Sequence, residues 1–251
     1  GSVDPVRDIE TVNLELIFSD IEVMDRRIEK VSKLAKGGEK EAKEQYDFML
    51  KIKKHLEDGK PVRTMELTKD ERELVKGFFL LTTKPVLYVA NISEDDLTSG
   101  NAENKFVKEV EKYARDENSE AVVISAKIEE ELSTLEDDEK LEMLKEYGLE
   151  EAGLDKLINA SYKLLGLISF LTAGEKEVRA LTIRRGAKAP EAAGKIHTDM
   201  QKGFIRAEII PYEKLVECGS ETAAKEKGYY RLEGKDYVMQ DGDVVNFRFN
   251  V

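Results

Sequence analysis

The first third of the chain places hydrophobic residues at a helical spacing, with charged residues between them. Apolar positions recur in alternating steps of three and four at Leu14, Ile17, Ile21, Met24, Ile28, Val31 and Ala35. A second series follows the break at Lys36-Gly37-Gly38 and consists of Ala42, Met49, Ile52 and Leu56. This heptad pattern predicts two helices that share one apolar seam, an antiparallel coiled coil. A third, short helix is predicted from Thr68 to about Leu80, because Thr68 and Glu71 can form a capping box.

The middle of the chain alternates strand-like and helix-like segments. Val86–Ala90 and Ala121–Ser125 are apolar runs without polar alternation, which is typical of strands buried on both faces of a parallel sheet. The charged segment Asn104–Arg115 between them predicts a helix. An acidic helix is predicted over Ile128–Tyr147 and a more apolar one over Leu154–Leu167. Two strands do not complete a doubly wound sheet, so we expect a partial one.

Several short strand-like segments surround one helix in the last third of the chain. The helix opens at Ala189-Pro190, and an Asp241-Gly242 turn is predicted near the end. The strand-like segments are Val178–Ile183, Phe204–Ile210, Tyr229–Leu232, Tyr237–Met239 and Val244–Phe249. This arrangement favours a β-grasp module. The predicted fold class is therefore α/β plus α, with a helical arm over residues 1–83, partial α/β sheet over 84–168 and the β-grasp module over 169–251.

Composition narrows the classes of function. The 251 residues carry a net charge of −12, with 37% charged and 41% hydrophobic residues. Such an acidic protein repels phosphate backbones except at a local basic patch. The single cysteine, Cys218, cannot form an internal disulfide, and no apolar run is long enough to span a membrane. Together with the lack of a signal peptide, these features predict a soluble cytoplasmic protein without a membrane partner.

Polar residues follow both predicted strands of the middle segment, where parallel sheets bind ligands. The first loop reads Asn91-Ile92-Ser93-Glu94, and the second reads Ser125-Ala126-Lys127. GTPases carry Asn-Lys-x-Asp at the first loop, and its Asp accepts hydrogen bonds from guanine N1–H and N2–H₂. Glu94 is longer by a methylene, which displaces the carboxylate and relaxes or reverses the preference for guanine. The second loop would present backbone groups to the purine edge, so ATP becomes a plausible ligand.

The other candidate residues indicate weaker functions. A small basic patch near the predicted β-grasp helix could contact RNA phosphates, or it could be ordinary solvated charge; it comprises Arg184, Arg185, Lys188 and Lys195. No Cys/His cluster has metal-ligand spacing, so no metal site is predicted. No residue is predicted to be catalytic.

Several long segments, in order across essentially the whole chain, resemble the YchF subfamily of Obg-type P-loop NTPases, also called Obg-like ATPases. They are VDPVRDIETVNLEL, KPVLYVANISEDD, VVISAKIEEEL, SFLTAGEKEVRA, APEAAGKIHTDMQKGFIRAE and DGDVVNFRFNV. The resemblance implies a G domain with an inserted coiled-coil arm, followed by a β-grasp TGS domain. It also implies NxxE in place of NKxD, ATP hydrolysis with Mg²⁺ in preference to GTP, and association with ribosomes or ribosomal RNA.

The chain departs from the family pattern at its front. It contains no GxxxxGK[ST] phosphate-binding loop and no DxxG motif, so it resembles the C-terminal two-thirds of such a protein and is expected to be inactive in hydrolysis alone. Leu181 stands where the family usually has Trp, and Ala187 where Thr is common, and these changes could soften a packing or RNA contact. Three functions stay open: nucleotide binding, a ribosome- or RNA-binding module, and a structural remnant that self-associates through an exposed sheet edge.

Overall fold

The computed structural model describes residues 2–37, 40–98, 104–174 and 177–250. The chain divides into two compact units, residues 1–160 and residues 161–251, which are described separately below.

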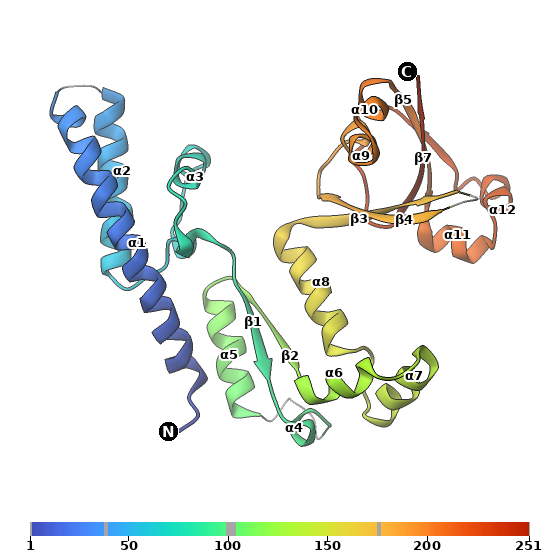
Figure 1. Cartoon of the computed structure of the whole chain (residues 1–251), viewed down its shortest axis with the longest axis horizontal. Helices are drawn as coiled ribbons and strands as arrows, with labels where there is room; N and C mark the ends of the chain where they lie inside the picture. Colours follow the sequence, from blue (N-terminus) through green and yellow to red (C-terminus); the bar gives the residue numbers. More distant parts are fainter. Residues whose placement is uncertain (1, 38–39, 99–103, 175–176, 251) are drawn as a thin grey trace. The chain divides into compact units, whose positions relative to one another are not determined.

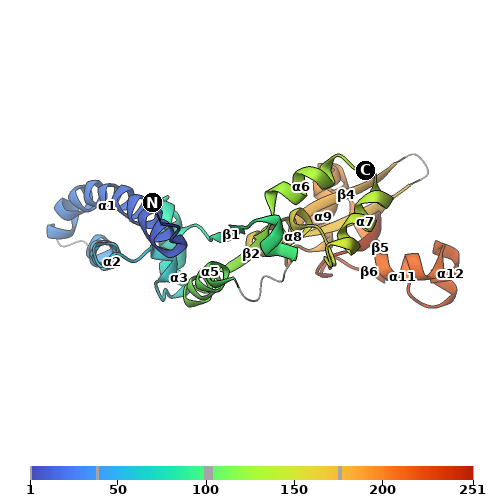
Figure 2. The same ribbon diagram turned by 90° about the horizontal axis from the view of Figure 1, so that it is seen from below.

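The first unit begins with the predicted helical hairpin, α1 (Pro5–Lys36) and α2 (Lys40–Glu57). Figures 1 and 2 show the two helices side by side. Helix α1 starts where the carboxylate of Asp4 accepts a hydrogen bond from the N–H of Arg7 at 3.0 Å, with Pro5 in the first turn. The shared seam is buried at Ile17, Met24, Met49, Ile52 and Leu56. The hairpin and most of its seam are therefore as predicted.

Leu14 does not belong to the seam, because its side chain is 43% exposed. The adjacent Asn13 is buried instead, and Asp20, seven residues further along α1, is a second buried polar position. The carboxylate of Asp20 accepts hydrogen bonds from the backbone N–H groups of Leu81 and Thr82, both at 2.8 Å. These bonds attach the segment that follows the hairpin to the side of α1.

Short helices follow the hairpin: η1 (Val62–Thr64), α3 (Lys69–Lys76) and η2 (Leu81–Thr83). The predicted capping box is present, since Thr68 Oγ1 accepts from the N–H of Glu71 at 3.2 Å and the Glu71 carboxylate accepts from the N–H of Thr68 at 2.8 Å. Helix α3 ends at Lys76, before the predicted Leu80, because Gly77 caps it.

The middle of the unit holds two parallel strands, β1 (Leu87–Asn91) and β2 (Glu120–Ile124), joined through α4 (Glu94–Thr98) and α5 (Lys105–Asp116). The parallel pairing and the crossover helix are as predicted. Burial on both faces is wrong for β1, because Val89 is 45% exposed. Among the described residues, β1 pairs with β2 alone, so one edge of β1 has no strand beside it.

Three helices follow β2, where two had been predicted: α6 (Ala126–Ser133), α7 (Asp137–Glu146) and α8 (Gly153–Leu165). The predicted single acidic helix over Ile128–Tyr147 is wrong, because it stops at Thr134 and restarts at Glu136 with a capping box to Glu139. The break lets α6 and α7 share a small apolar core, formed by Ile128, Leu132 and Leu144.

The second unit contains a five-stranded sheet in the order β4-β3-β7-β5-β6, in which only β3 and β7 run parallel. Numbered within the unit, this is the order 2-1-5-3-4 of a β-grasp sheet. The strands are β3 (Leu167–Ala173), β4 (Val178–Arg184), β5 (Phe204–Pro211), β6 (Arg231–Glu233) and β7 (Asp243–Phe249).

One face of this sheet is covered by α9 (Ala189–Ile196) (Figure 1). Small residues on α9 allow a close approach to aromatic side chains of the sheet, and the rings of Phe170 and Phe247 meet edge to face at 6.0 Å. Leu181 and Ala187 also pack against this core, so the two departures from the family pattern are packing positions. The remaining helices are α10 (Thr198–Lys202), α11 (Tyr212–Cys218) and α12 (Glu221–Glu226).

Three features of this unit differ from the sequence prediction. Strand β3 was not among the predicted strands, and it begins at Leu167, where the predicted helix still continued, because Gly166 adopts a left-handed conformation with φ +62° and ends α8. Tyr237–Met239 forms a single bridge between Lys188 and Val238 and no strand. Helices α11 and α12 were not predicted at all.

Candidate functional site

The two loops singled out from the sequence meet at the carboxyl ends of the parallel strands β1 and β2. The strands are parallel, with Asn91 opposite Ile124. Asn91 Oδ1 accepts a hydrogen bond from the backbone N–H of Ala126 at 2.9 Å. The N–H of Ile92 donates to the carbonyl of Ile124 at 2.9 Å. A side chain of the first loop is therefore fixed against the second loop, and a backbone group of the first loop is fixed against the end of β2.

Glu94 is the first residue of α4, and two side chains hold its carboxylate. Lys127 Nζ donates to Oε2 at 2.5 Å, and the hydroxyl of Tyr147 donates to Oε1 at 3.0 Å. The hydrogen bond from Lys127 and, second, the one from Tyr147 lower the pKa of Glu94. The bond to Glu94 in turn raises the pKa of Lys127 and of Tyr147. The carboxylate is thus kept ionised and is oriented by contacts within the protein.

The second loop offers backbone groups more than side chains. Ser125 is 1% exposed, and its hydroxyl has no hydrogen-bond partner among the described residues. Ala126 and Lys127 are exposed and begin α6. Ser125 therefore cannot present its side chain to a ligand at this surface, whereas the backbone that follows it can.

A groove of about 740 Å³ opens beside the first loop. Asn91, Ile92 and Ser93 line one part of it, and mainly apolar side chains from α1, β1 and α5 line the rest, together with Asp8, Asn13 and Asp96. Some of these are strongly exposed, such as Val12 at 60% and Phe106 at 40%. The polar loop thus borders a large apolar surface.

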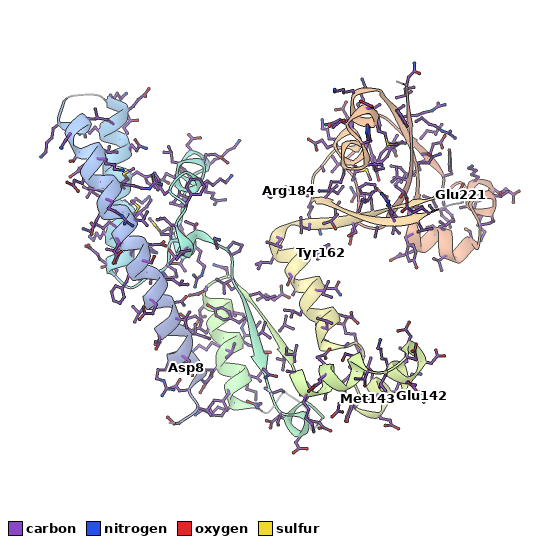
Figure 3. The ribbon with its side chains drawn as sticks, in the orientation of Figure 1. Asp8, Glu142, Met143, Tyr162, Arg184 and Glu221 are labelled. Atoms are coloured by element: carbon purple, nitrogen blue, oxygen red, sulfur yellow. The ribbon has the colours of Figure 1, made fainter. Side chains whose placement is uncertain are left out.

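The basic residues predicted to contact RNA lie in the second unit, at the end of β4 and at the two ends of α9. Arg184 ends β4, as labelled in Figure 3, and Arg185 follows it; both are exposed. Lys188 precedes α9, and its Nζ is paired with Asp236 at 2.7 Å, which raises the pKa of Lys188. Lys195 lies seven residues further on, about two helical turns away and on the same face of the helix. The pairing to Asp236 reduces the positive charge that Lys188 can offer.

Within the described ranges, His, Cys, Asp and Glu side chains do not gather in any group of three that could hold a metal ion. The same residues include no helix of sufficient length and apolarity to cross a membrane.

Tyr147 was missed by sequence reasoning. It lies 53 residues after Glu94 and directly after α7, in a segment predicted to be a solvated acidic helix. Its ring packs against the core of Ile128, Leu132 and Leu144, which fixes its position. A tyrosine in an otherwise charged segment was the one signal available, and it does not indicate which carboxylate the hydroxyl reaches.

Comparisons with known proteins agree with this arrangement. The family model YchF-GTPase_C, described as a protein of unknown function (DUF933), matches residues 167–250. The chain is 53% identical over its whole length to the ribosome-binding ATPase YchF of Bacillus subtilis, of which it covers 68%. It is 42% identical over its whole length to Obg-like ATPase 1 of Gallus gallus and covers 64% of that protein.

Solved structures give the same result. The YchF GTPase of Schizosaccharomyces pombe superposes with a TM-score of 0.86 at 34% identity, covering 99% of this chain and 67% of that one. A GTP-binding protein from Pyrococcus horikoshii shares the fold, with a TM-score of 0.58 at 20% identity, over 100% of this chain and 73% of that one. Fold and neighbours define a mixed α/β protein related to GTPases. The chain belongs to the YchF family of Obg-like ATPases, as its sequence motifs predicted.

Proposed function

We propose that this chain recognises the purine base of a nucleotide, with ATP preferred over GTP. The base would lie at the carboxyl ends of β1 and β2, beside Asn91, Ile92, Glu94, Ser125, Ala126 and Lys127, with the second loop contributing backbone groups. The observation that carries the proposal is the 2.9 Å hydrogen bond from Ala126 to Asn91, because it fixes two loops at a strand edge where α/β sheets bind ligands. The names of the relatives, ribosome-binding ATPase and Obg-like ATPase, support a nucleotide ligand.

The phosphates and Mg²⁺ need groups that these loops do not supply. Phosphate binding in P-loop proteins relies on the backbone and lysine of GxxxxGK[ST], which does not occur in these 251 residues. We therefore expect the chain by itself to bind ATP weakly through the base and not to hydrolyse it. Measured turnover of ATP by the purified chain would contradict this part of the proposal.

Calorimetric titration with ATP and with GTP, each with Mg²⁺, tests the site. Asn91→Ala removes the tie between the loops and is expected to weaken ATP binding about 3- to 10-fold, since one hydrogen bond contributes roughly 0.5–1.5 kcal/mol. Asn246→Ala is the matched control, because it removes a 2.8 Å hydrogen bond to Glu208 in the second unit. Equal losses in both variants, or no binding of ATP by the unmodified chain, would refute the proposed site.

A second candidate function is docking on the ribosome. It is favoured by the names of relatives and by the exposure of Arg184, Arg185 and Lys195 on a protein of net charge −12. On such an acidic chain, a local group of cations is the place where ribosomal RNA phosphates would bind.

Binding to purified Bacillus subtilis ribosomes as a function of salt tests this candidate. Neutralising Arg184, Arg185 and Lys195 to Gln should reduce the magnitude of the negative slope of log K against log salt by up to about 2, at roughly 0.7 per phosphate contact. The matched control neutralises three exposed lysines on α5: Lys105, Lys108 and Lys112. If both triple variants change the slope equally, only net charge matters and these basic residues have no special role.

The edge of β1 is a further place for contact, in this case with a second copy of the chain. Unpaired backbone groups at an exposed strand edge favour pairing with another strand. We therefore propose weak self-association through β1, which sedimentation at increasing protein concentration would reveal. A sedimentation coefficient independent of concentration would exclude it.

A further inference from the structure

The carboxylate of Glu94 is enclosed by two donors that come from elements far apart in the sequence. Lys127 is on the first turn of α6, and Tyr147 follows α7. Each takes a different oxygen, Oε2 at 2.5 Å and Oε1 at 3.0 Å, and the Glu94 side chain keeps only 27% of its exposure. Among the described residues each oxygen thus has a donor, and the two donors together fix both the direction and the plane of the carboxylate.

The orientation of the Glu94 carboxylate affects whether the site favours guanine or adenine. A carboxylate that recognises guanine must accept from N1–H and N2–H₂ together, so both oxygens have to face the purine edge. Glu94 has one oxygen held by an ammonium group and the other by a phenol. Turning towards guanine would break two hydrogen bonds to the ionised carboxylate, one from an ammonium group and one from a phenol. Adenine offers an acceptor at N1 and no N2 amine, so it makes no such demand on a carboxylate.

We propose that Tyr147, together with Lys127, is a specificity-determining residue that disfavours guanine by holding the Glu94 carboxylate away from the purine edge. The inference rests on the proposed function, since it concerns base choice at that same site. Tyr147 acts through Glu94 and is a positioning residue. Its ring is packed against the apolar core between α6 and α7, so its hydroxyl is held in place before any ligand binds.

A comparison of Tyr147→Phe with the unmodified chain tests this inference. The substitution removes the hydroxyl and keeps the ring in its core. The ratio of the GTP to the ATP dissociation constant, measured by calorimetry or by NMR titration, should fall at least about 3-fold, the effect expected for one hydrogen bond. The carboxyl-carbon NMR titration of Glu94 should show a higher pKa in the variant, because a donor to the ionised form is lost.

Two further variants make the test specific. Glu94→Ala in the Tyr147→Phe background should abolish the gain in GTP binding, because the released carboxylate is the group that gains. Tyr162→Phe, which removes a hydroxyl hydrogen bond of 3.1 Å to Thr182 in the second unit, should leave the ratio unchanged. Tyr162 is labelled in Figure 3.

The results of these experiments distinguish a failure of the proposed function from a failure of the inference about Tyr147. If the unmodified chain binds neither nucleotide, the proposed function falls and this inference falls with it. If it binds ATP, and Tyr147→Phe leaves the ratio unchanged while the pKa of Glu94 rises, the inference alone is wrong. An unchanged pKa of Glu94 would also overturn it, because Tyr147 would then not hold the carboxylate in solution.

Discussion

The guanidinium of Arg63 lies 3.0 Å from the carboxylate of Glu117, and the two side chains are only 7% and 10% exposed. Arg63 also donates to Asn13 Oδ1 at 3.0 Å, and the hydroxyl of Tyr88 donates to Glu117 at 2.9 Å. This network therefore joins the helical hairpin to β1 and to the residue after α5. Tyr88 lies three residues before Asn91, so the network also supports the strand that carries the proposed base site.

Breaking the Arg63–Glu117 pair is expected to destabilise the first unit strongly. Arg63→Met leaves the Glu117 carboxylate buried without its ion-pair partner, which costs about 3–5 kcal/mol of the free energy of unfolding. Urea unfolding followed by circular dichroism measures the loss. Glu73→Gln is the control, because it breaks the exposed Lys76–Glu73 pair of 2.7 Å and should cost less than about 1 kcal/mol. A small effect of Arg63→Met would show that the pair is open to water in solution.

Two tyrosines should resist ionisation at high pH. Burial, and then a hydrogen bond to Glu117, raises the pKa of Tyr88 from 10.0 to about 12. Burial, and then Asp243, raises the pKa of Tyr237 to about 12. The folded state therefore favours the neutral phenols, and this stabilisation is fully present below pH 10.0 and is lost as the pH rises through about 12.

Near-ultraviolet absorbance of tyrosinate tests this prediction. The absorbance should rise in two stages, with a late component that becomes smaller in Tyr88→Phe and in Tyr237→Phe. A single early transition for all tyrosines, with the protein still folded, would show that neither ring is shielded.

Gly203 should tolerate no side chain. A Cβ atom there would stand 1.8 Å from the backbone oxygen of Asn250, whose N–H donates to the Gly203 carbonyl at 2.9 Å. Gly203→Ala should therefore displace the end of β7 and cost about 1–3 kcal/mol or more. Gly234→Ala is the control, since no atom lies within 4 Å of its Cβ position, and it should leave the melting temperature unchanged or slightly raised. Equal melting temperatures for the two variants would refute the close approach.

Two adjacent phenylalanines should respond in opposite ways. Phe78 is 3% exposed and its ring lies 6.2 Å from that of Phe48, so Phe78→Ala should cost about 3–5 kcal/mol. Phe79 is 84% exposed and has a left-handed backbone with φ 56°. The left-handed conformation of Phe79 destabilises the folded state by about 1–2 kcal/mol, and Phe79→Gly relieves this strain. The substitution also adds a backbone entropy penalty of about 0.5–1 kcal/mol for glycine. Its stability should be unchanged or slightly raised, and a loss comparable with that of Phe78→Ala would contradict the assigned exposure.

Local patterns were sufficient to predict much of the fold. The heptad spacing predicted the hairpin, and the Thr68–Glu71 pair predicted the start of α3. The apolar runs predicted β1 and β2, and their parallel pairing placed Asn91 near Ala126. These predictions succeeded because each depends on residues close in sequence or on a general rule of sheet geometry.

Contacts between distant segments could not be predicted in this way. Tyr147 reaches Glu94 only because the acidic segment breaks at Thr134–Glu136 and folds back, and nothing in its charge pattern indicates the break. The Arg63–Glu117 pair likewise joins residues that only the folded chain brings together. Val89 was predicted to be buried because it is apolar, but an apolar side chain does not indicate which face of the sheet is covered by other elements.

An amide NMR titration of this chain with ATP is the sharpest test of the proposed base site, because it detects weak binding and locates it. We expect shifts concentrated at Asn91 to Glu94 and at Ala126 and Lys127, and smaller shifts with equal concentrations of GTP. Shifts confined to residues around Arg184 and Lys195, or none at all, would contradict a base site at the ends of β1 and β2.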